Sequence, residues 1–168
     1  MSGHRLKVAV LLVAAVVLHQ SFFATVRLGD VQPHVMLLVA VAAAIVGGPE
    51  RGAVIGFSAG LLSDVLVRTP LGLSALTFSL VAFGVGFVYS SVIRSAWWMA
   101  PTTAFVASAA GICLYALLGA LMGQAHFVRP AMLVAAGLVG AVNALLAPLA
   151  VRAMSWAMAV GADRSYAR

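Results

Sequence analysis

The sequence predicts an all-α protein that crosses a membrane several times and forms a single transmembrane domain over residues 1–168. Of the 168 residues, 64% are hydrophobic and 8% are charged, and the mean hydropathy is +1.11. A soluble domain carries roughly a quarter charged residues, so this chain is too apolar to be one. The second observation is a series of six apolar segments divided by turn and breaker residues. We therefore expect six transmembrane helices with very short connections.

The six expected helices cover Leu6–Val26, Pro33–Gly48, Gly52–Val67, Leu71–Val92, Trp97–Met122 and Ala131–Met158. The first resembles a signal peptide because Arg5 and Lys7 precede its apolar run, but that run continues without a clean cleavage site, which favours a retained helix. The second and third are shorter than the roughly 20 residues that a crossing needs. We expect them to cross a thin region of bilayer, or to have ends lined by protein.

The basic residues predict the orientation. With six crossings both termini lie on one side of the membrane. That side holds Arg5, Lys7, Arg51, Arg94, Arg152, Arg164 and Arg168, and the other side holds Arg27, Arg68 and Arg129. The positive-inside rule places the richer side, and thus both termini, in the cytoplasm. Because the basic residues are scattered singly, the net charge of +6 indicates topology and lipid headgroup contacts rather than nucleic-acid binding.

The third segment contains the pattern G-x-S-x-G at residues 56–60, which is typical of serine hydrolases. In those enzymes a sharp strand-to-helix turn exposes the serine beside a base and an oxyanion hole. Here Ser58 lies inside a continuous helical segment, and no base is fixed by spacing. We expect Ser58 to bond to the local backbone and predict no catalytic residue. The single cysteine, Cys113, is expected to pack as a small hydrophobe, and no metal or cofactor motif occurs.

Three glycines in the same segment, Gly52, Gly56 and Gly60, are spaced four residues apart and so share one helix face. Small residues let helix backbones approach closely in a membrane, so this glycine ladder predicts a helix contact, either internal or with another protein. Asp64 continues the same face. It is expected either to form a local ion pair with Arg68 or to have a direct functional role, because a carboxylate within a span is costly.

Other polar residues within the spans are His19, Gln20, Tyr115 and Asn143, each of which can bond across helices. A weaker hypothesis brings His19, His34 and Asp64 together as a small polar pocket in the outer half of the membrane. Trp98 and its neighbour Trp97 are expected to anchor the cytoplasmic interface.

Together these features resemble the rod shape-determining protein MreD family. Three features of the sequence carry this resemblance. They are Pro33, which opens the second span, and the two motifs Gly52-x-x-x-Gly56-Phe57-x-x-Gly60-Leu61-Leu62-x-Asp64 and Leu71-Gly72-Leu73-x-Ala75-Leu76. The motifs lie within residues 33–90, and the flanking spans match in hydrophobicity and number.

The resemblance implies a non-enzymatic scaffold of the bacterial elongation machinery in the cytoplasmic membrane. Such a protein binds MreC, and through it MreB, RodA and a class B penicillin-binding protein that builds lateral peptidoglycan. The family is also similar in fold to the substrate-binding S components of vitamin transporters, which implies an alternative function as a small-molecule-binding component. A vitamin-binding site needs several polar groups at defined positions. Because the predicted spans contain few polar residues and these are scattered, the scaffold function is favoured. Pairing with a second copy stays open.

Overall fold

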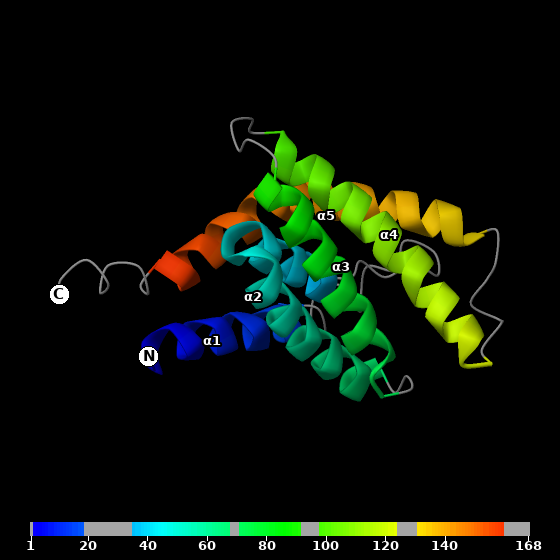
Figure 1. Cartoon of the computed structure of the whole chain (residues 1–168), viewed down its shortest axis with the longest axis horizontal. Coiled ribbons are helices and arrows are strands. Elements are labelled where there is room, and N and C mark those ends of the chain that lie inside the picture. Colours follow the sequence, from blue (N-terminus) through cyan, green and yellow to red (C-terminus); the bar gives the residue numbers. More distant parts are fainter. Residues whose placement is uncertain (1, 19–34, 68–70, 92–97, 124–130, 160–168) are drawn as a thin grey trace.

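The computed structural model describes residues 2–18, 35–67, 71–91, 98–123 and 131–159. These residues form five helices and no strand (Figure 1). The helices are α1 (Ser2–Leu18), α2 (Val35–Val67), α3 (Leu73–Ser91), α4 (Met99–Leu121) and α5 (Ala131–Ala159). The prediction of an all-α protein is confirmed. Six separate helices are not confirmed: five helices are described, and the expected second and third helices are the two parts of α2 on either side of the non-helical residue Gly48.

A sharp bend at Gly48 explains that difference. Gly48 has φ 82° and ψ −178°, a conformation that is open almost only to glycine, while the residues on both sides are helical. Pro49 follows and suits the first position of a new helical stretch, since it needs no backbone donor there. A Cβ built on Gly52 would lie 2.6 Å from the Cα of Ala44. The two arms of α2, residues 35–47 and 49–67, therefore fold back on one another at the predicted break.

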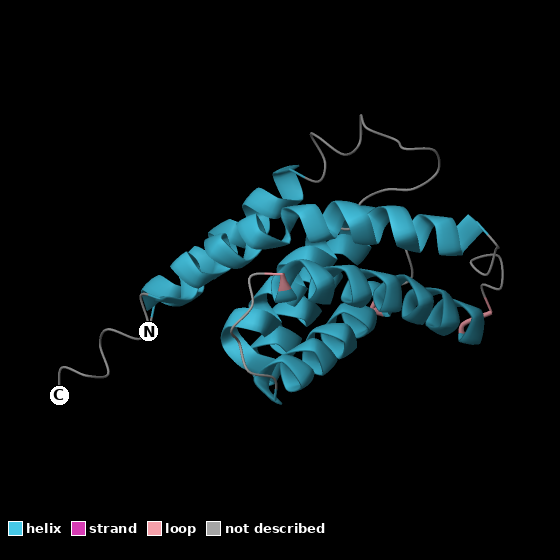
Figure 2. Ribbon diagram, turned by 90° about the horizontal axis from the view of Figure 1, so that it is seen from above, coloured by secondary structure: helices cyan, strands magenta, loops and turns pink. Residues whose placement is uncertain are grey.

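The first arm of α2 forms the centre of the core. Its ten residues from Met36 to Ile45 are each at most 5% exposed. The buried residues that complete this cluster come from all the other helices and include Leu12, Phe78, Ala104 and Met154. Figure 2 shows the described residues as a bundle of helices, and the burial of the first arm places it inside that bundle. The short second segment is thus lined by protein, which is one of the two alternatives that its length had left open.

Among the described residues, four helices are long and apolar enough to cross a membrane: α2 over Val35–Leu66, α3, α4, and α5 over Ala136–Met158. The outer surface suits hydrocarbon, because large apolar side chains such as Leu121 and Leu145 are 77% and 82% exposed. Within the described residues α1 supplies only a shorter apolar stretch, Leu6–Val17. The rest of the predicted first span lies outside the described residues.

The start of α1, the bend of α2 and the end of α5 lie at one end of the molecule. The ammonium of Lys7 lies 4.4 Å from the ring centroid of Trp156. A Cβ on Gly47, beside the bend, would lie 3.1 Å from the sulfur of Met158. The second half of α3 reaches the same bend, since a Cβ on Gly86 would lie 2.6 Å from Pro49.

Candidate functional site

The glycine motif forms the joint between the second arm of α2 and α3. A Cβ on Gly56 would lie 2.7 Å from the carbonyl oxygen of Phe78, and a Cβ on Gly60 would collide with the backbone of Ser74 and Ala75. Later positions in α2 thus meet earlier positions in α3, so the two helices are antiparallel. Backbone contact this close is possible only because these positions carry no side chain.

Asp64 closes the joint where α2 ends and α3 begins. Asp64 is 1% exposed, and its carboxylate accepts three backbone hydrogen bonds. Oδ2 accepts from the N–H of Gly72 at 2.8 Å and of Ala75 at 3.3 Å, and Oδ1 accepts from the N–H of Ser74 at 3.1 Å. The first N–H groups of a helix have no partner within it, and the helix dipole favours a negative charge there.

Asp64, which belongs to the preceding helix α2, therefore caps the N-terminus of α3. The turn between them needs Gly72, which has φ 100°. The expected partners of Asp64 are not placed: Arg68, His19 and His34 all lie outside the described residues. The proposed ion pair with Arg68 and the histidine pocket thus stay predictions, while the cap is a role that the spacing alone had not indicated.

Ser58 is bonded locally, as its position in the helix had indicated. Its hydroxyl donates to the carbonyl oxygen of Val54 at 2.9 Å, one turn earlier in α2. Serine in helices commonly makes this bond. The G-x-S-x-G pattern therefore lies on a regular helix, not on the exposed turn that a hydrolase nucleophile requires.

A second polar contact joins α4 to α5. The amide nitrogen of Asn143 donates to the hydroxyl of Ser108 at 2.8 Å, and both side chains are fully buried. The interhelical bond expected of Asn143 is confirmed. Ser108 was missed, although a small polar residue in mid-span, within reach of a buried asparagine, is a usable signal. The Asn143 oxygen Oδ1 has no hydrogen-bond partner among the described residues.

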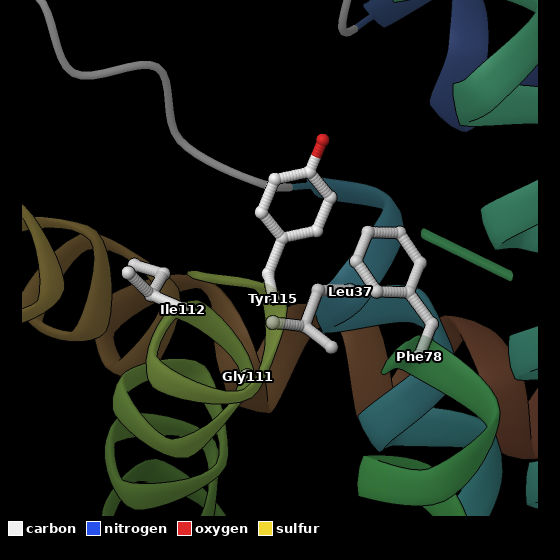
Figure 3. Close-up of a pocket in the computed structure, with 5 residues that line it drawn as sticks. All are labelled: Leu37, Phe78, Gly111, Ile112 and Tyr115. Carbon is white, nitrogen blue, oxygen red and sulfur yellow. The ribbon is translucent and has the colours of Figure 1, made fainter. Parts of the chain in front are cut away.

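A small cavity lies where the core arm of α2 meets α3 and α4. It has a volume of about 50 Å³ and is lined by Leu37, Phe78, Gly111, Ile112 and Tyr115 (Figure 3). A Cβ built on Gly111 would lie 2.7 Å from Cδ2 of Leu37, and the Tyr115 hydroxyl points away from Gly111 (Figure 3). Small-molecule sites usually measure about 300–1,000 Å³. This cavity is too small for a vitamin-sized ligand.

Residues 3–152 match the family model described as rod shape-determining protein MreD. The matched range runs from the start of α1 into the last third of α5 and includes the glycine ladder, Asp64 and the Ser108–Asn143 pair. No curated protein and no solved structure matches the chain.

Proposed function

The chain belongs to the rod shape-determining protein MreD family, and from this premise we propose that it is a non-enzymatic scaffold of the bacterial cell-elongation complex. In this role it binds MreC in the cytoplasmic membrane, and through MreC it connects to MreB, RodA and a class B penicillin-binding protein. The family match over residues 3–152 is the observation that carries the proposal. The engagement of Ser58 with its own helix supports a non-enzymatic role.

We further propose six membrane crossings with both termini in the cytoplasm, each arm of α2 counting as one crossing. The second arm, residues 49–67, measures about 28 Å at the helical rise of 1.5 Å per residue, close to the thickness of the hydrocarbon core. The first arm is shorter, but it is surrounded by protein and need not match the bilayer. Lys7, Arg51 and Arg152 all lie near the end that holds the bend of α2, which supports a cytoplasmic position for that end.

The glycine ladder and Asp64 serve this function indirectly in our proposal. Gly56 and Gly60 face the backbone of α3, so a partner helix has no access to them in this arrangement. Their role is to hold the second arm of α2 in a fixed position against α3. The outward-facing side chains of the two helices then keep a constant arrangement. A partner that recognises these side chains depends on the joint without touching it.

The small-molecule-binding alternative is not favoured. The cavity in the core holds about 50 Å³, and the carboxylate of Asp64 is used by the N-terminus of α3. A high-affinity site needs several convergent polar groups, and the lining of this cavity supplies only the Tyr115 hydroxyl as a polar side-chain group.

Copurification tests the proposal. The affinity-tagged chain is expressed with MreC from the same organism, extracted in a mild detergent and captured, with an unrelated polytopic membrane protein of similar size as the control bait. We expect MreC to be retained by the chain and not by the control bait. Equal MreC recovery from both baits, with the chain eluting as a folded, monodisperse species, contradicts the proposal.

A glycine series then separates direct from indirect roles. Gly60→Leu disrupts the α2–α3 joint, whereas Gly137→Leu is a matched control because a Cβ on Gly137 meets nothing within 4 Å. We expect Gly60→Leu to lower the amount of folded protein and to leave the amount of MreC bound per folded molecule unchanged. A fall in that ratio at constant folded amount means that the ladder itself contacts the partner.

A further inference from the structure

An exposed tryptophan with two cationic neighbours lies where the start of α1 meets the end of α5 (Figure 1). Trp156 is 63% exposed, and the ammonium of Lys7 lies over its ring, 4.4 Å from the centroid. Arg152 is also exposed and precedes Trp156 by four residues, so the two side chains share one face of α5. Two cationic residues from different helices are thus neighbours of the same indole. We call Lys7, Arg152 and Trp156 the Trp156 cluster.

The positive charge of the Trp156 cluster is not balanced by the protein around it. The acidic residues in the described part of the chain are Glu50, at the bend of α2, and Asp64, which caps α3. Neither of them forms an ion pair with Lys7 or Arg152. The contact of an ammonium with an indole face is electrostatic and leaves N–H donors free for other partners. The cluster therefore presents two positive charges to a ligand outside the chain.

The position of Arg152 along α5 places this ligand at the membrane surface. Arg152 lies within the apolar stretch Ala136–Met158, six residues and about 9 Å before its end. A charge exposed to hydrocarbon is costly, so the guanidinium has to reach polar surroundings. Trp156 marks the headgroup level, which tryptophan favours, and it lies about 6 Å further along the axis. The long stem of an arginine extends that far, which brings its guanidinium to the level of the Lys7 ammonium.

The surroundings of the cluster favour an amphiphile over a soluble anion. Deeper in the membrane, the same sides of α1 and α5 carry Val10, Leu149 and Leu145, which are 60%, 68% and 82% exposed. A ligand with an anionic head and apolar tails satisfies both regions at once. At the headgroup level the group that fits the cations is a phosphodiester, because a guanidinium donates two parallel hydrogen bonds to phosphate oxygens.

The net charge of the cluster distinguishes between phospholipids. A zwitterionic headgroup carries an ammonium, which two cations repel, whereas an anionic headgroup brings negative charge alone. We propose that the Trp156 cluster binds the headgroup of an anionic phospholipid, whose phosphodiester lies between Lys7 and Arg152. The lipid thereby joins α1 to α5. This site is independent of MreC binding and rests only on the membrane location of the helices.

Native mass spectrometry of the full chain tests the site. The protein in mild detergent is titrated with phosphatidylglycerol, and in parallel with phosphatidylethanolamine, and the apparent Kd of the first bound lipid is measured. We expect phosphatidylglycerol to bind more tightly. Lys7→Gln and Arg152→Gln should each weaken its binding about fivefold, the factor that one basic group near an anionic headgroup contributes. Both side chains are at the surface, so either variant can be tested if the other does not elute as a folded species.

Arg51→Gln is the matched control. It removes the same charge at the same end of the molecule, but Arg51 lies beside Gly47 at the bend of α2 and not at the Trp156 ring. Its affinity for phosphatidylglycerol should equal that of the unmodified protein. Arg152→Lys keeps the charge and should recover most of the affinity that Arg152→Gln loses.

Three results overturn the proposal. The first is equal affinity of the unmodified protein for the two lipids. The second is an equal loss of phosphatidylglycerol binding in Arg51→Gln and Arg152→Gln, which would assign the preference to net charge and not to the cluster. The third concerns Ser155, which is exposed beside Arg152 and donates to its carbonyl oxygen at 2.8 Å. A photoreactive residue at position 155 that crosslinks in cells mainly to a polypeptide would assign the cluster to a protein partner.

Discussion

Replacing Gly60 by alanine inserts a methyl group where the backbone of α3 already lies. The new Cβ would collide with the Cα of Ala75 and the carbonyl oxygen of Ser74, two atoms that no rotamer change can move. In an unhindered helix, exchanging glycine for alanine stabilises by about 1 kcal/mol. Overpacking costs about 1–3 kcal/mol, and displacing α2 also strains the Asp64 cap one turn away, whose bonds contribute about 1 kcal/mol each. We expect a net loss of about 1–3 kcal/mol in the free energy of unfolding.

The unfolding free energy of the detergent-extracted protein is measured by titration with a denaturing detergent. Gly137→Ala is the matched control, since the same exchange meets open space there and should stabilise by up to about 1 kcal/mol. The two substitutions are thus expected to change the free energy of unfolding in opposite directions. A Gly60→Ala protein as stable as Gly137→Ala would refute the close contact between α2 and α3.

The remaining predictions concern the cap, the polar pair and the topology. Asp64→Ala should destabilise more than Asp64→Asn, because the amide keeps one acceptor for the N–H groups of α3; equal unfolding free energies would contradict the cap. A double-mutant cycle of Ser108→Ala and Asn143→Ala should give a coupling of about 0.6–1.7 kcal/mol, and simple additivity would exclude a contributing bond. In a Cys113→Ser background, a cysteine at position 165 should resist an impermeant thiol reagent in sealed cells, whereas labelling would place the C-terminus outside.

The sequence alone predicts the helical class, the approximate ends of most helices and the break near Gly48. These features depend on hydrophobic length and on glycine and proline, which are local properties. It does not predict how closely the two arms of α2 pack on one another, nor that the first arm fills the core. Both depend on the contact of Gly52 with Ala44 and of Gly86 with Pro49, which are set by packing.

For the candidate site, too, the sequence indicates which residues matter but not what they contact. The four-residue spacing of the glycines indicated a close helix contact, but only the structure shows that Gly52 meets Ala44 of the first arm whereas Gly56 and Gly60 meet α3. Asp64 was singled out because a buried charge is costly. Its partners include backbone N–H groups eight to eleven residues later, and a pattern of side chains in the sequence does not identify backbone donors.

Restoration of cell shape tests the central claim, a non-enzymatic rod-shape scaffold, most directly. In a rod-shaped bacterium that has lost its own family member and become round, the chain is expressed together with its own MreC, and cell length and width are measured. The account predicts that the unmodified chain and Ser58→Ala restore rods equally, because the Ser58 hydroxyl only bonds to Val54. Round cells with the unmodified chain present in the membrane, or rods lost only with Ser58→Ala at normal protein levels, would contradict it.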